Sequence, residues 1–230
     1  MDQERTNENR SPVLEELRPG ARRLYFLFGG INSRVGMPQF EFYRSAQILD
    51  EHKIFLRDFS QSWYQRGLPG IAADPFELGE YLKSRIAELA PEQVTFVGNS
   101  MGGFAAILFA SMLGTGRAIA FAPQTFISPG RRLAARDFRW TRQLLPTYAA
   151  TAFRPHLYDL PSALGKRLSR PSAIDIYYSR HERLDALHAE TLAGLESVQL
   201  HPRDVGGHML VRHLRDTGAL ADVLRASAVR

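Results

Sequence analysis

Residues 94–103 read Val-Thr-Phe-Val-Gly-Asn-Ser-Met-Gly-Gly, a short apolar run that leads through a glycine-rich turn into an apolar helical pattern. Residues 98–102 match G-x-S-x-G, a pattern that chance alone places in roughly one chain in ten to twenty. The context makes it specific, because a serine on a sharp strand-to-helix turn stands clear of the sheet at a helix N-terminus, where negative charge is stabilised. We therefore predict that Ser100 is a catalytic nucleophile, the alternative being the capping residue of an ordinary turn.

Short apolar runs alternate with longer helical patterns along the rest of the chain, which is typical of a parallel sheet with crossover helices. Nearly continuous apolar runs suit strands that are covered on both faces. The sequence predicts an α/β fold, with a mostly parallel six-stranded sheet and helices on both faces. The predicted strands cover residues 24–28, 54–56, 94–97, 118–121, 173–178 and 198–201.

The bulk composition favours one domain. The chain has 230 residues, of which 44% are hydrophobic, and it has no cysteine. The absence of cysteine excludes disulfides and thiol catalysis and fits a reducing, cytoplasmic compartment. Residues 1–20 are polar and lack the apolar stretch of a secretory signal, and no run approaches 18 apolar residues. We expect a flexible tail over 1–20, a single domain over 21–230, and no association with membranes.

Residues 125–171 interrupt the alternation of strands and helices. This segment holds five prolines and nine Lys or Arg against Asp137 and Asp159, so it accounts for the net charge of +5. A long insertion at this place is usually functional or disordered, and we predict a lid. Guanidinium groups bind carboxylates and phosphates in bidentate fashion, which makes Arg131, Arg136 and Arg139 candidate ligands of an anionic substrate. No nucleic-acid-binding motif accompanies the charge, so we expect no nucleic-acid partner; a solvated basic face is the alternative explanation.

The strand, Gly98-Asn-Ser-Met-Gly-Gly103, the helix and a late Gly206-Gly207-His208 together resemble the α/β-hydrolase superfamily over about residues 22–225. This resemblance implies a serine esterase-like or thioesterase-like enzyme, with the chain order nucleophile, acid, base. It also implies that the six strands, numbered along the chain, lie in the spatial order 2-1-3-4-5-6.

The base and the acid follow from this order. Of the seven histidines, only His208 follows the last predicted strand through a Gly-Gly turn, and a near-neutral pKa suits a catalytic base. The acid is expected after the strand at 173–178, where both Glu182 and Asp185 are candidates. We rank Asp185 first; the alternative is that Asp185 caps the following helix. Either carboxylate would fix the tautomer of the histidine.

Two further groups of residues are candidates for binding. An oxyanion hole needs two backbone N–H donors, and the resemblance implies Met101 and the turn after the first strand, where we favour Ile31 over Gly30. Residues 57–64 follow the second strand, and Arg57, Asp58 and Trp63 are candidates for a substrate crevice. An ion pair between Arg57 and Asp58 is the structural alternative.

The leading functional hypothesis is hydrolysis of an ester or thioester on a small-molecule or carrier-linked acyl substrate, anionic if the arginines face it. Acyl transfer by the same residues is the alternative within this class. A non-catalytic binding module on the same fold is the alternative outside it. No motif for a metal or cofactor is present, so we expect none. The sequence does not indicate an oligomeric state.

Overall fold

The computed structural model describes residues 11–31, 40–151, 155–166, 168, 171–205 and 207–226. Its centre is a seven-stranded sheet in the order β1-β3-β2-β4-β5-β6-β7. All neighbouring strands pair in parallel except β1 and β3. The strands are β1 (Val13–Glu16), β2 (Arg23–Phe28), β3 (His52–Leu56), β4 (Gln93–Asn99), β5 (Arg117–Phe121), β6 (Ala173–Ser179) and β7 (Val198–Arg203). The six strands β2 to β7 lie in the predicted order.

The strand β1 corrects both the predicted strand count and the predicted tail. It pairs antiparallel with β3 and places Glu16 opposite Lys53. Glu15 holds a second contact, a salt bridge of 2.5 Å from its Oε2 to Arg85 Nη2. These polar contacts attach β1 to the domain, although the hydropathy of this segment alone predicts a flexible tail. The prediction of a flexible tail is therefore wrong for residues 13–16, whereas residues 1–10 lie outside the described part of the chain.

Helices cover both faces of the sheet, as the alternation of side chains along β2 requires. Leu24, Phe26 and Phe28 face a core that includes α2 (Pro75–Leu89), α3 (Met101–Leu113) and α8 (Arg183–Glu190). Tyr25 and Leu27 face a second core. That second core is built with η1 (Ser45–Ile48), α9 (Leu210–Asp216) and α10 (Ala219–Ala226). The helix α3 is buried nearly all round, as its apolar sequence predicts.

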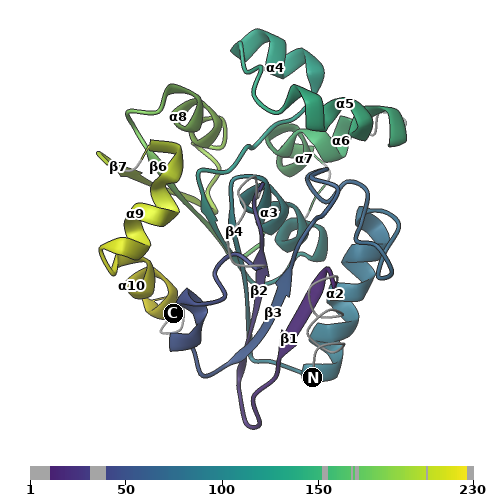
Figure 1. The fold of residues 1–230 in the computed structure, drawn as a ribbon, viewed down its shortest axis with the longest axis vertical. Coiled ribbons are helices and arrows are strands. Elements are labelled where there is room, and N and C mark those ends of the chain that lie inside the picture. The colour runs from purple at the N-terminus through teal and green to yellow at the C-terminus, as the bar shows by residue number, and fades with distance from the viewer. Residues whose placement is uncertain are drawn as a thin grey trace, which may run out of the picture.

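The insertion after β5 folds into four helices within its described residues. They are α4 (Pro129–Ala135), α5 (Thr141–Ala150), α6 (Pro155–Tyr158) and α7 (Leu160–Lys166). Figure 1 shows them together with α8 near the end of the sheet at which β4 leads into α3. Leu144, Tyr158 and Leu164 are buried in the same core as α3, so these helices pack on the domain. Among the described residues, no helix has the length and apolar character needed to cross a membrane.

The attachment of β1 is testable at its ion pair. Lys53 is completely buried, and its Nζ lies 3.1 Å from Glu16 Oε2 and 3.0 Å from the carbonyl oxygen of Leu49. Replacing Glu16 by Gln leaves a buried ammonium without its counter-ion, and we expect the free energy of unfolding to fall by about 1–3 kcal/mol. Urea unfolding measures this loss.

Lys53→Met is the matched control. It removes the buried charge, and Glu16 stays partly hydrated, so we expect a smaller loss than for Glu16→Gln or none. Equal stability of Glu16→Gln and the wild type would show that the ion pair does not hold β1 on the sheet.

Candidate active site

Ser100 occupies a strained turn between β4 and α3. Its backbone angles are φ 53° and ψ −114°, in a region that residues with a side chain rarely adopt. Two glycines make the turn possible. A Cβ atom on Gly98 would lie 2.0 Å from the carbonyl oxygen of Gly102, and one on Gly102 would lie 2.2 Å from that of Phe28. The G-x-S-x-G spacing is therefore a steric requirement of this strand-to-helix turn.

His208 lies beside the serine. It belongs to the short helix η2 (Gly207–Met209) between β7 and α9, and its Nε2 is 3.4 Å from Ser100 Oγ. Its Nδ1 is 2.9 Å from both Asp185 Oδ1 and Asp185 Oδ2. An ionised carboxylate can only accept a hydrogen bond, so Nδ1 carries the proton and donates this bond to Asp185, and the lone pair of Nε2 faces the serine hydroxyl. The three side chains therefore lie in a line with His208 in the middle, and along the chain they follow the predicted order of serine, carboxylate and histidine.

The two candidate acids differ in position. Asp185 is in the first turn of α8, is 1% exposed in its side chain, and contacts the histidine. Glu182 is at the N-cap position of the same helix, one turn earlier. Glu182 therefore precedes the first residue of α8, and the first turn of this helix places Asp185 beside His208.

The backbone donors near Ser100 are not equivalent. Met101 is the first residue of α3, where the N–H has no acceptor within the helix. The N–H of Gly30 donates to Glu41 Oε2 at 2.7 Å. Gly30 is thus engaged by a side chain of the protein. Ile31 is the remaining predicted donor in this turn.

Sequence reasoning missed Glu41. Its Oε1 accepts a hydrogen bond of 2.7 Å from Asn99 Nδ2, so one carboxyl group joins the turn after β2 to the residue before the nucleophile. Burial raises the pKa of Glu41, and the hydrogen bonds from Gly30 and Asn99 oppose that shift. No local pattern signals this role, because the partners of Glu41 are 11 and 58 residues away in the chain.

Comparison with solved structures decides the fold. No protein-family model and no curated protein matches the chain. A capsule O-acetyltransferase of Neisseria meningitidis serogroup A superposes with a TM-score of 0.61 at 15% identity, over 90% of this chain and 88% of that one. An alpha/beta hydrolase from the metagenome of lagoon sediments at Mar Chica gives a TM-score of 0.57 at 14% identity, over 95% of each chain. An a/b serine hydrolase without lid from Xanthomonas campestris gives 0.52 at 16% identity, over 93% and 88%.

The chain has the α/β-hydrolase fold. The sheet order, the strained serine and the position of His208 after β7 agree with this result. The structural superpositions establish the fold, and sequence identities of 11–16% leave the substrate open.

Two predicted substrate ligands lie inside this α/β-hydrolase fold. Asp58 is 4% exposed, and its carboxylate accepts hydrogen bonds from the backbone N–H groups of Ser60, Ser62 and Tyr64. It therefore shapes its own loop and does not depend on an ion pair with Arg57.

Trp63 is fully buried. Its indole N–H is bonded to the side chain of Gln124 at 2.7 Å. We correct both assignments: these polar side chains satisfy buried groups of the protein. The guanidinium of Arg57 lies 4.8 Å from the centroid of the Phe59 ring.

Two of the three predicted lid arginines also pair with carboxylates of the protein. Arg131 Nε is 2.6 Å from Asp159 Oδ2. Arg139 lies between two carboxylates, those of Asp137 and Asp185. Arg136 is exposed, in a left-handed conformation with φ 52°. Pairing within the protein thus replaces the anionic ligand that we expected at Arg131 and Arg139.

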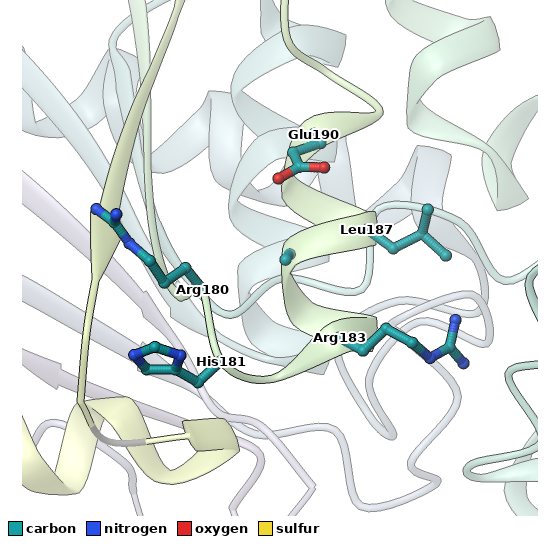
Figure 2. Close-up of a pocket in the computed structure, with 6 residues that line it drawn as sticks. Arg180, His181, Arg183, Leu187 and Glu190 are labelled. Carbon is teal, nitrogen blue, oxygen red and sulfur yellow. The ribbon is translucent and has the colours of Figure 1, made fainter.

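A separate pocket lies on the outer side of α8. Its volume is about 380 Å³, and it is lined by Arg180, His181, Arg183, Ala186, Leu187 and Glu190 (Figure 2). Its residues come from α8 and the turn before it. Arg180 is paired with Asp204, at 2.8 Å between Nε and Oδ1. Because opposite charges line and flank this pocket, we assign it no substrate.

The steric requirement at the turn is testable. Gly102→Ala places a methyl group against the backbone of β2. We therefore expect the free energy of unfolding, measured by urea unfolding, to fall by about 1–3 kcal/mol or more. The control is Gly130→Ala in α4, where an added Cβ meets nothing within 4 Å. Alanine favours a helix over glycine by up to about 1 kcal/mol, so the control should be as stable as the wild type or more stable. Equal losses in both variants would contradict the steric explanation.

Proposed function

We propose that this chain is a serine enzyme that cleaves an acyl ester or thioester, with Ser100 as nucleophile, His208 as general base and Asp185 as the acid. One observation carries the proposal: a strained serine lies 3.4 Å from a histidine nitrogen whose opposite ring nitrogen is 2.9 Å from a buried carboxylate. A distance slightly beyond hydrogen-bond range is common in a free enzyme and shortens when substrate binds.

The chemistry proceeds in two steps. Ser100 Oγ attacks the acyl carbonyl carbon while its proton moves to His208 Nε2, and Asp185 stabilises the imidazolium that forms. The tetrahedral intermediate collapses, the bond to the leaving group breaks, and His208 gives its proton to the departing oxygen or sulfur. In the second step His208 accepts a proton from water, the resulting hydroxide attacks the acyl carbon, and the proton returns to Ser100 as the acid product leaves.

The negative charge of the tetrahedral intermediate needs two donors. The N–H of Met101 at the start of α3 is the first. We assign the second to Ile31, because the N–H of Gly30 already donates to Glu41. In this proposal Glu41 is a positioning residue, since it fixes the turn that presents Ile31.

Acyl transfer is a second candidate. The chain superposes on the capsule O-acetyltransferase of Neisseria meningitidis with a TM-score of 0.61. In this variant a hydroxyl group of an acceptor replaces water in the second step, and all other roles are unchanged. We no longer favour an anionic acyl substrate, because Arg131 and Arg139 are paired with carboxylates of the protein.

The triad is tested by labelling and turnover. A fluorophosphonate probe should label the wild type and fail to label Ser100→Ala. With p-nitrophenyl esters and acyl-coenzyme A thioesters as substrates, we expect Asp185→Asn to lower kcat by about 10³–10⁴-fold, because the histidine tautomer is lost.

The matched control is Glu182→Gln, on the same helix, which should keep kcat within a few-fold of the wild type. Adding an alcohol acceptor separates the two candidates: a new ester product indicates transfer, and free acid alone indicates hydrolysis. Absence of probe labelling in the wild type would leave the binding-module hypothesis in place of the enzyme.

The role of Glu41 gives a second prediction. Glu41→Ala removes the acceptor for both Gly30 and Asn99, so we expect turnover to fall by up to about 100-fold as the oxyanion donors shift. Glu41→Gln should be milder. Within the described residues Asn99 Oδ1 has no hydrogen-bond partner. If the side-chain amide of Asn99 turns over, this oxygen can accept a hydrogen bond from the Nε2 of the new glutamine. Equal turnover of wild type and Glu41→Ala would remove Glu41 from this role.

A further inference from the structure

The acid Asp185 has a second partner from the insertion. Arg139, in the connection between α4 and α5, donates from Nη1 to Asp185 Oδ1 at 2.9 Å. The same oxygen is 2.9 Å from His208 Nδ1. A guanidinium 46 residues away in the chain thus touches the carboxylate that orients the base.

Arg139 is itself held in place. Its Nε and Nη2 donate to the two oxygens of Asp137, each at 3.0 Å. Burial lowers the pKa of Arg139, but the hydrogen bonds and charges of Asp137 and Asp185 outweigh it and raise the pKa overall, so the group stays charged. Arg132 fixes the backbone of this connection by donating to the carbonyl oxygen of Arg139.

A second contact joins the same two segments. Asp137 Oδ2 lies 2.9 Å from His188 Nε2, and His188 is one turn after Asp185 on α8. Burial lowers the pKa of His188, and the charge of Asp137 does not compensate, so His188 is neutral at pH 7. Two residues of the insertion therefore hold two residues of α8.

The charges in this cluster have a consequence for the base. Asp137, Asp185 and Arg139 sum to one negative charge beside His208, whereas without Arg139 the sum would be two. Glu41 also interacts electrostatically with His208, and Arg215 with Glu41. A cation on the far side of Asp185 offsets part of the negative charge that this carboxylate presents to His208.

We infer that Arg139 is a positioning residue of the active site: it fixes the carboxylate of Asp185 and sets the pH range in which His208 is an unprotonated base. The inference rests on the proposed function for its catalytic meaning, and on geometry alone for the charge that His208 experiences. It makes the catalytic acid dependent on the packing of the insertion against α8.

The test compares Arg139→Gln with Arg131→Gln, which breaks an ion pair in the same insertion, with Asp159. We expect Arg139→Gln to raise the titration midpoint of His208, followed by NMR of the imidazole, by about 0.5–1 pH unit, because one cation is lost. The acid limb of the pH–kcat/KM profile should move up by the same amount, and kcat should fall with KM nearly unchanged. Arg131→Gln should leave all three as in the wild type.

Asp137→Asn should shift the midpoint of His208 in the opposite direction, and it replaces Arg139→Gln as the test if that variant does not fold. It removes a negative charge while Arg139 remains, so the midpoint of His208 should fall. A wild-type midpoint in the variant that folds, or an equal shift in Arg131→Gln, overturns the inference. If the fluorophosphonate probe fails to label the wild type, the proposed function fails, and the NMR midpoints still decide the role of Arg139.

Discussion

The position of Ser100 depends on contact between backbones that leaves no room for a side chain. The start of α3 packs at Gly102 against the carbonyl group of Phe28 at the end of β2, while Gly98 lies against the same turn of α3. The strained φ of 53° at Ser100 persists only because several surrounding contacts hold the backbone in this conformation. Here they do so through the sheet. The N–H of Ser100 donates to the carbonyl oxygen of Phe121 in β5 at 2.8 Å. The N–H of Ala122 then donates to that of Tyr177 in β6 at 2.7 Å.

The register of the central strands therefore shapes the candidate active site. Asn99 lies opposite Phe121, and Phe121 lies opposite Tyr177, so β4 and β5 end at the same level and β6 continues two residues further, to Ser179. The connections that follow parallel strands all leave from this edge. The serine, the acid and the histidine come from the connections after β4, β6 and β7. Ser100 and His208 are 108 positions apart, and they meet because parallel strands of one sheet end at the same edge, so none of the three side chains needs a long loop to reach the others.

Most of this framework could be predicted from the sequence, because strands that are buried on both faces appear as continuous apolar runs. The strands β2 to β7 and the serine turn follow from such runs and from glycine spacing, whereas the strand order and the choice of His208 also rest on the resemblance to the α/β-hydrolase superfamily. β1 was missed because Glu15 and Glu16 attach it through ion pairs, which hydropathy reads as solvent exposure. The choice between Glu182 and Asp185 depends on which residue begins α8, and helix boundaries are uncertain by one or two residues from pattern alone.

Long-range polar pairing is the part that no local pattern reveals. The arginines of the insertion signalled an anion, and anions are indeed present at Arg131 and Arg139, but they belong to Asp159, Asp137 and Asp185. A net charge counted along the sequence cannot distinguish a carboxylate of the protein from one of a ligand.

Burial explains why an arginine stands beside Asp185. Asp137 and Asp185 are 3% and 1% exposed, and two carboxylates so close together are costly unless a cation is shared between them. A guanidinium can donate to both at once, with paired bonds to Asp137 and a third bond to Asp185, whereas an ammonium is a single point of charge. The cluster keeps one uncompensated negative charge at rest. A proton on His208 would neutralise it, so the resting charge favours the imidazolium that forms in the proposed mechanism, and Arg139 limits how strongly.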